Sequence, residues 1–160
     1  MPISLILCLF VTSTITSAKP FCCERAKPSA ASCPFCDLTI IRDADEIDNR
    51  VELDRGGKKT EYRCVLCALV DTKADRGNVI IVAPSEKKGK PVTLTRSAGA
   101  WSVDPDTAVF VYVKGSHAQC QVRYRAISSK AAFDAYLQTN SKVLASAKLI
   151  SLADLIKRAE

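Results

Sequence analysis

The chain has 160 residues, of which 48% are hydrophobic and 25% charged, and its formal net charge is +6. This length allows one domain, and the composition is that of a globular protein rather than a disordered chain. The basic residues are dispersed and aromatic residues make up only 6%. Nucleic-acid-binding proteins more often combine a basic stripe with stacking aromatics, so the charge predicts a solvated surface instead.

The N-terminal segment predicts export. Residues 3–11 are almost continuously apolar, and residues 12–18 become small and polar. This pattern is typical of a signal peptide that ends at a small-residue cleavage site. The apolar run is too short for a membrane span. We therefore expect residues 1–18 to be a signal peptide and the mature protein to be periplasmic or secreted.

A linker and one folded domain are expected after the signal peptide. Residues 19–32 contain two prolines, Cys22 and Cys23 and show no hydrophobic periodicity, which is typical of a linker. The domain is then expected to occupy residues 33–160. Its strands are predicted from alternating or β-branched apolar runs bounded by turn residues. These runs are Arg50–Arg55, Thr60–Cys64, Asn78–Ala83, Val92–Arg96, Ala100–Val103, Ala108–Lys114 and Val122–Ile127.

Three helices are predicted from apolar residues at helical spacing. The first covers Val65–Asp75, the second begins after Ser128 or Ser129 and ends near Asn140, and the third begins after Ser151. A serine at these starts can cap the first backbone amides of the helix. Strands and helices together predict an α+β fold, with a small, mostly antiparallel sheet and short helices on one face.

Two Cys-x-x-Cys pairs carry the functional prediction. Cys33-Pro-Phe-Cys36 and Cys64-Val-Leu-Cys67 are separated by a segment that contains the predicted glycine hairpin, which can bring the pairs together. Four thiolates presented in this way form a tetrahedral sulfur site of the kind that Zn²⁺ prefers. Disulfides are also compatible with export, although short paired spacings constrain the unfolded chain little. A Zn- or disulfide-stapled protein-interaction domain is therefore the open alternative.

His117 and Cys120 are auxiliary candidates, because both lie in the segment between two predicted strands and offer borderline and soft donors. A thiol-disulfide oxidoreductase is the main enzymatic alternative, since Cys33-Pro-Phe-Cys36 resembles a glutaredoxin-like tetrad. That chemistry needs a strand before the motif and a helix after it, whereas a linker precedes Cys33. The sequence shows no credible nucleophilic triad, so we expect a metal-binding protein rather than an enzyme.

Several motifs occur in a recognisable order. They are Cys33-Pro-Phe-Cys36-Asp37-Leu38, Tyr62-Arg63-Cys64 leading into a helix, and the C-terminal segments at 111–116 and 133–137. In this order they resemble the NosL family of copper-binding accessory proteins. The resemblance implies an α+β domain related to the organomercurial-lyase fold. It also implies that the protein is a Cu(I) chaperone or accessory protein for the maturation of a copper enzyme such as nitrous oxide reductase.

The chain departs from that family at its soft ligands. Asp37 and Leu38 stand where the family has glycine and methionine, Cys120 stands near another usual methionine, and Met1 is the only methionine. An all-thiolate site is therefore expected, which suits Cu(I) or Zn²⁺. The candidate metal ligands are Cys33, Cys36, Cys64 and Cys67, with Cys120 and His117 as auxiliaries. The expected partners are a metal ion and a recipient copper enzyme, without nucleic acid or a stable membrane span.

Overall fold

The computed structural model describes residues 31–40, 50–114, 122–144 and 146–160, with only the backbone described at 114, 122–124 and 140–144. The expected signal peptide, Cys22, Cys23, His117 and Cys120 lie outside these residues. The described elements follow one another as β1 (Val51–Arg55), β2 (Lys58–Tyr62), α1 (Val65–Asp71), η1 (Thr72–Ala74), β3 (Val79–Ala83), β4 (Val92–Ser97), β5 (Ala100–Asp104), β6 (Val109–Lys114), β7 (Val122–Ile127), α2 (Lys130–Leu144), β8 (Lys148–Ile150) and α3 (Leu152–Ala159).

A five-stranded antiparallel sheet forms the larger half of the domain, in the order β2-β1-β3-β4-β5. Its first hairpin turns at Gly56 and Gly57, whose φ angles of 59° and 92° are in the left-handed region that glycine adopts without a steric penalty. The sequence-predicted second strand began two residues later than β2 does. Val51, Leu53 and Tyr62 are buried on one face of this hairpin, as the alternation predicts.

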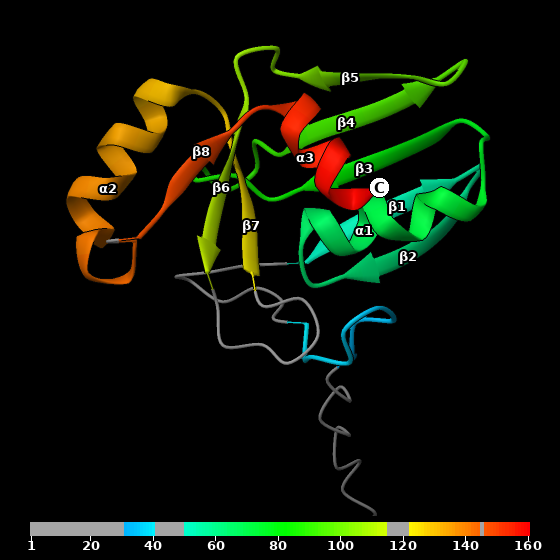
Figure 1. Ribbon diagram of the computed structural model, residues 1–160, viewed down its shortest axis with the longest axis horizontal. Coiled ribbons are helices and arrows are strands. Elements are labelled where there is room, and N and C mark those ends of the chain that lie inside the picture. Colours follow the sequence, from blue (N-terminus) through cyan, green and yellow to red (C-terminus); the bar gives the residue numbers. More distant parts are fainter. Residues whose placement is uncertain (1–30, 41–49, 115–121, 145) are drawn as a thin grey trace, which may run out of the picture.

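A second antiparallel sheet, in the order β7-β6-β8, lies beside the first (Figure 1). Strand β8 was not predicted, because three residues are too few to show an alternating pattern. Helix α2 covers this sheet, and a small core of Val111, Ile127 and Phe133 lies beneath it. Helix α3 packs against both α1 and β6, so the C-terminal segment joins the two halves.

Helix α1 lies on the inner face of the large sheet, where it covers the main core (Figure 1). The single helix predicted over Val65–Asp75 is in fact α1 followed by the 3-10 turn η1, because the Thr72 hydroxyl donates to the Leu69 carbonyl at 2.7 Å and ends the α-helix. Helix α2 continues past the predicted end to Leu144. Helix α3 has the expected Ser151 cap, which accepts a hydrogen bond from the Asp154 amide.

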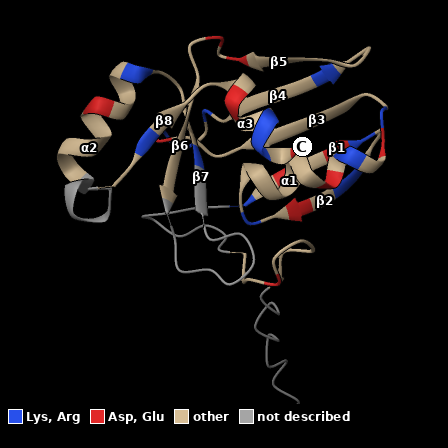
Figure 2. Ribbon diagram, viewed as in Figure 1, with Lys and Arg blue, Asp and Glu red and all other residues tan. Residues whose placement is uncertain are grey.

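These elements confirm the α+β fold class with antiparallel sheets and short helices. Basic and acidic residues are interspersed over the elements and do not form a stripe along any described helix or strand (Figure 2). None of the helices in the described ranges is long and apolar enough to cross a membrane.

Arg96 ties the segment after α1 to the large sheet. Although it is on the buried face of β4, its guanidinium donates to three carbonyl oxygens: Thr72 at 3.1 Å, Asp75 at 2.6 Å and Gly77 at 3.0 Å. It also lies 5.4 Å from the centre of the Trp101 ring. The buried guanidinium therefore supplies hydrogen-bond donors to three carbonyls of the connecting segment. Its charge is in turn compensated by these carbonyl dipoles and by the face of the Trp101 ring.

We expect Arg96→Met to lower the free energy of unfolding by about 3 kcal/mol, because it leaves buried carbonyls without a donor. Arg76→Met provides a matched control, since Arg76 is exposed on the same connecting segment. Chemical denaturation of both variants measures the difference. Equal unfolding midpoints for the two variants would contradict the role assigned to Arg96.

Candidate metal centre

The first Cys-x-x-Cys pair lies on a tight loop within residues 31–40. The Cys33 amide donates to the Leu38 carbonyl at 2.9 Å, and the Asp37 amide donates to the Cys33 carbonyl at 2.9 Å. The ends of the loop pair through an isolated antiparallel bridge. This conformation buries Cys33 and Cys36, which are 0% and 2% exposed, and leaves Phe35 42% exposed. The loop therefore directs its two sulfurs inward and its aromatic ring outward.

The second pair lies where β2 passes into α1. Cys64 is the residue before the helix, with extended backbone angles of φ −154° and ψ 164°, and Cys67 is in the first helical turn. Both are buried, at 7% and 0% exposure. The Arg63 guanidinium donates to the Thr39 carbonyl and so joins this junction to the first loop. The two pairs are thus held against each other by the chain around them.

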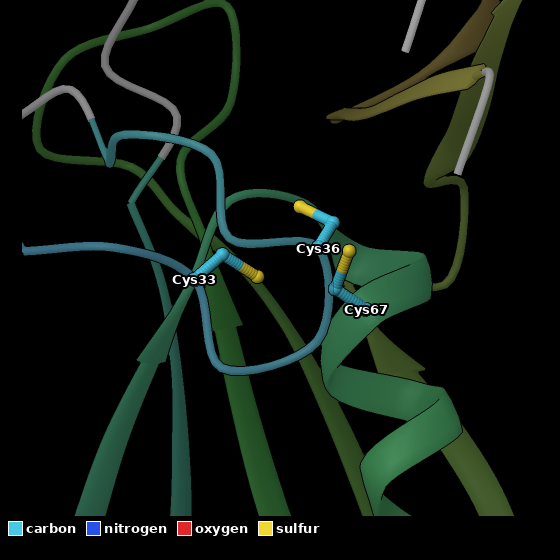
Figure 3. Close-up of side chains that lie close together, drawn as sticks. All are labelled: Cys33, Cys36 and Cys67. Carbon is cyan, nitrogen blue, oxygen red and sulfur yellow. The ribbon is translucent and has the colours of Figure 1, made fainter. Parts of the chain in front are cut away.

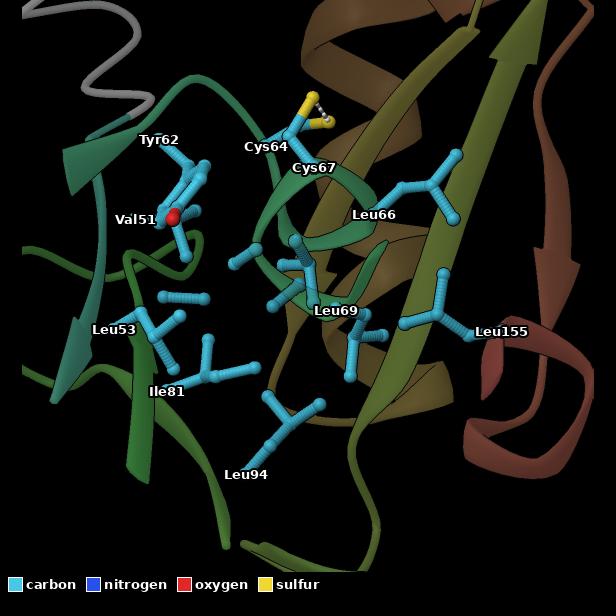
Figure 4. Close-up of a cluster of buried hydrophobic side chains, with 14 of the residues drawn as sticks. Val51, Leu53, Tyr62, Cys64, Leu66, Cys67, Leu69, Ile81, Leu94 and Leu155 are labelled. Atoms are coloured by element: carbon cyan, nitrogen blue, oxygen red, sulfur yellow. Dashed lines mark hydrogen bonds between the residues drawn. The ribbon is translucent and has the colours of Figure 1, made fainter. Parts of the chain in front are cut away.

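The sulfurs of Cys33, Cys36 and Cys67 all lie within 4.8 Å of one another (Figure 3). The Cys64 sulfur is 3.3 Å from that of Cys67, with which it shares a hydrogen bond (Figure 4). Sulfurs bound to one ion through bonds of about 2.3 Å lie roughly 4 Å apart, so small side-chain rotations are sufficient to close the three sulfurs on a metal. This cluster, Cys33, Cys36 and Cys67, can hold a metal ion and is called the three-sulfur group below.

The far end of α1 is fixed by a polar contact with β1. The Arg55 guanidinium donates to the backbone carbonyl of Asp71 at 2.9 Å and to its carboxylate. Buried Tyr62 also contacts this pair, and its pKa is raised, first by burial and then by the Asp71 carboxylate. Because α1 is held at both ends, the position of Cys67 over the core is determined by the sheet as well as by the loop (Figure 4).

The electrostatics of the site favour one ionised sulfur. A hydrogen bond from Cys67 lowers the pKa of the Cys33 thiol from 9.0 to about 5, and the backbone amides of Arg63, Cys36 and Phe35 act in the same direction against burial. Burial raises the pKa of Cys36. Hydrogen bonds with Cys33 and Cys64 raise the pKa of Cys67. At neutral pH the cluster therefore presents a thiolate at Cys33, which is the form that binds soft metal ions.

Asp37 adopts a left-handed backbone conformation, with φ of 56°. Aspartate tolerates this region better than most residues, and glycine tolerates it best. Aspartate is therefore compatible with the turn that follows Cys36. This turn was not predicted, because nothing in a single sequence reveals a backbone angle.

The structure brings together four of the six candidate ligands. Cys33, Cys36 and Cys67 form the three-sulfur group, and Cys64 touches it through Cys67. His117 and Cys120 lie outside the described residues. Dithiol chemistry needs a strand before the motif and a helix after it. Within the described residues, Cys64–Cys67 has this context, because β2 precedes it and α1 begins after Cys64, whereas residues 31–40 around Cys33 and Cys36 contain neither element. The hydrogen bond from Arg63 to the Thr39 carbonyl was not predicted, because no sequence pattern indicates which carbonyl a single arginine will bind.

No known family model and no curated protein matches this chain. Among solved structures, the mercury-bound form of MerB2 is similar, with a TM-score of 0.52 and 18% sequence identity. The match covers 67% of this chain and 54% of that chain, so it spans about half the length of MerB2. At this identity the likeness establishes a related α+β fold.

The positive φ of Asp37 leads to a substitution test. Asp37→Gly is expected to retain stability, whereas Asp37→Val should cost about 1–2 kcal/mol, because a β-branched residue is strained in the left-handed region. Unfolding by urea measures both. Thr39→Val is the matched control, since it adds the same side chain at an exposed position of the same loop. If Asp37→Val and Thr39→Val cost the same, the turn does not depend on this backbone angle.

The shifted pKa of Cys33 predicts a pH-dependent stability for the reduced, metal-free protein. Folded Cys33 loses its proton near pH 5, whereas an unfolded cysteine holds its proton to about pH 9, so the unfolded state binds more protons between these values. This contribution to stability should therefore rise with pH through that interval and be lost as pH falls toward 5. The measurement is the difference in unfolding free energy between the wild type and Cys33→Ser at several pH values. A difference that stays constant would contradict the assignment.

Proposed function

We propose that this protein is an exported Cu(I)-binding protein that carries copper to a copper-dependent enzyme. The observation that carries this proposal is the buried three-sulfur group, whose sulfurs lie within 4.8 Å of one another. Soft thiolate donors select soft ions such as Cu(I). The cargo ion would be held by Cys33, Cys36 and Cys67, with Cys64 in contact with the last of these. Cys120 and His117 remain proposed auxiliary ligands.

Cu(I) is favoured over Zn²⁺ by the number of sulfurs that converge. Structural zinc sites are almost always tetrahedral with four protein ligands, whereas Cu(I) accepts fewer sulfur donors. Three sulfurs form the compact group, and the Cys64 sulfur, which lies 3.3 Å from that of Cys67, is outside it. The low pKa of Cys33 supports binding at neutral pH, because the ion does not first have to displace a proton from that sulfur.

Membership of the NosL-like copper accessory proteins is part of the proposal. It is supported by the related fold of MerB2, a structure described in its mercury-bound form, and by the left-handed turn at Asp37 where that family has glycine. Export through the predicted signal peptide at residues 1–18 would place the protein in the periplasm or outside the cell. There, a buried thiolate group protects Cu(I) from solvent until a recipient is met.

The shortness of the exposed segment between Cys33 and Cys36 favours delivery of the ion over permanent storage. Cys33 and Cys36 are separated by only Pro34 and Phe35, both of which are exposed. A recipient that contacts the Phe35 ring therefore comes within two residues of both sulfurs. Such a contact allows sulfur ligands to be exchanged one at a time, so that the ion is never released to water.

A Zn- or disulfide-stapled interaction domain is the second candidate, because the four sulfurs belong to the main hydrophobic core rather than to an open surface. In that case the metal or disulfide would hold residues 31–40 onto α1. Its binding energy would then be folding energy, and its removal would unfold the domain. A copper carrier must instead remain folded when empty.

Metal binding by the purified, reduced protein tests the proposal. One Cu(I) ion per chain is expected. Cys67→Ser should weaken binding by at least about 100-fold, which is more than the loss expected from changing a residue that only orients a ligand. Cys64→Ser is the matched control and should retain most of the affinity, because it leaves the three-sulfur group intact. Competition with a chromophoric Cu(I) chelator measures both.

Two results would contradict the copper proposal. The first is the absence of bound Cu(I) under reducing conditions. The second is a domain that binds Zn²⁺ in preference and unfolds when the zinc is removed, which supports the stapled domain instead. Circular dichroism of the metal-free protein distinguishes an empty carrier, which retains its strands and helices, from a domain that depends on its metal.

A further inference from the structure

Cys67 belongs to two sulfur groupings at once. Its sulfur lies within 4.8 Å of the sulfurs of Cys33 and Cys36, and it is 3.3 Å from that of Cys64 (Figures 3 and 4). A sulfur that enters a disulfide is no longer a thiolate and ceases to be a strong ligand for a soft ion. Cys67 can therefore complete the three-sulfur group or pair with Cys64, but it cannot do both.

We propose that Cys64 and Cys67 form a reversible disulfide that releases the bound ion. This inference rests on the proposed Cu(I)-binding function and adds a control to it. In the reduced protein, Cys67 supplies the third thiolate. In the oxidised protein, only Cys33 and Cys36 remain as ligands in the group, and the ion is transferred to a competing ligand.

The local geometry suits this pair. Cys64 has an extended backbone and immediately precedes α1, and Cys67 is in the first turn of this helix. The change from extended to helical backbone at this point brings the two side chains together. A disulfide has a sulfur–sulfur bond of about 2.0 Å. The 3.3 Å separation is already a direct contact, so rotation about the side-chain bonds closes the remaining gap. Both ends of α1 are held by contacts with neighbouring segments, so the backbone at Cys64 and Cys67 can stay in place while the disulfide forms.

Exposure sets the order of events. Cys64 is 7% exposed and Cys67 is 0% exposed, so we expect a reagent to react at Cys64 first. Cys67 then lies behind Cys64 as the resolving sulfur. The three cysteines of the three-sulfur group are, by contrast, 0–2% exposed as whole residues. An incoming disulfide can therefore begin the reaction at Cys64 without first entering the metal group.

The oxidant is a small-molecule disulfide, RSSR, and the reaction is thiol–disulfide exchange. The Cys64 thiolate attacks one sulfur of RSSR, forming a mixed disulfide and releasing RS⁻. The Cys67 thiolate then attacks the Cys64 sulfur, forming the Cys64–Cys67 bond and releasing the second RS⁻. The two cysteines lose two electrons and RSSR gains them. The proton of the Cys64 thiol leaves with the first RS⁻ as RSH. Cys67, which held Cu(I) as a thiolate, carries no proton, so the second RS⁻ takes its proton from water or stays a thiolate. The oxidation state of Cu(I) is unchanged.

The experiment loads the reduced full chain with Cu(I), adds oxidised glutathione, and follows copper transfer to a chromophoric chelator. The chain itself simplifies disulfide mapping, because cleavage after Arg63 and Lys73 gives a peptide with Cys64 and Cys67, whereas Cys33 and Cys36 lie on a separate peptide ending at Arg42. The disulfide makes the first peptide lighter by two hydrogen atoms. We expect this loss of mass to accompany copper release.

Cys64→Ser is the critical variant, because it retains the cysteines of the three-sulfur group and removes the thiol with which Cys67 would pair. It should retain Cu(I) in the reduced state and release it at least about tenfold more slowly than the wild type when oxidised glutathione is added. Cys64→Ala removes the same thiol without adding a hydroxyl to a buried position. It serves as the second variant if the serine variant folds poorly.

The outcomes separate this inference from the function on which it rests. If the reduced wild type does not retain Cu(I), the proposed function fails and the release mechanism fails with it. If the wild type retains Cu(I) but Cys64→Ser releases it as fast on oxidation, only the Cys64–Cys67 mechanism is overturned. A disulfide mapped to Cys33 and Cys36 would overturn it in the same way.

Discussion

The burial of four cysteine sulfurs where a short loop meets the start of α1 is the constraint on which the rest of the site depends. A thiol contributes little to packing compared with a large apolar side chain, yet these sulfurs occupy one end of the main core. The loop is held there by backbone hydrogen bonds and by the contact of Arg63 with Thr39. The helix is held by Arg55 at its other end. The sulfurs therefore converge because the scaffold brings them together.

This arrangement divides the four cysteines into different chemical roles. Hydrogen bonding stabilises the thiolate at Cys33, whereas burial and hydrogen bonding keep Cys36 and Cys67 protonated to higher pH. Metal binding must therefore release protons mainly from the latter two, which links affinity to pH. Cys64 is outside this group, and its sulfur lies 3.3 Å from that of Cys67. Three converging sulfurs are thus available for a soft metal ion, and the fourth sulfur lies beside them.

The sequence predicted most of the fold because its strands carry clear patterns. Val51, Leu53 and Tyr62 alternate with polar residues and are buried on one face, and Ser151 caps α3 as expected. The errors occur where the pattern is short or where a side chain interrupts the backbone. Strand β8 has only three residues, and it forms because β6 offers a free edge. Helix α1 ends early because Thr72 bonds back to the preceding turn, which an apolar periodicity does not reveal.

By itself, the sequence determined the fold class and the residue types available for chemistry, since periodicity and Cys-x-x-Cys spacing are local properties of the chain. Only the tertiary structure decided which sulfurs meet. Spacing alone does not distinguish the cysteines of the two pairs, but in the folded chain the sulfurs of Cys33, Cys36 and Cys67 form the group that lies within 4.8 Å, and Cys64 is not part of it. The left-handed turn at Asp37 was likewise invisible in the sequence. The meeting of Cys67 with Cys33 and Cys36 depends on a contact between segments far apart in the chain, and such a contact leaves no local pattern.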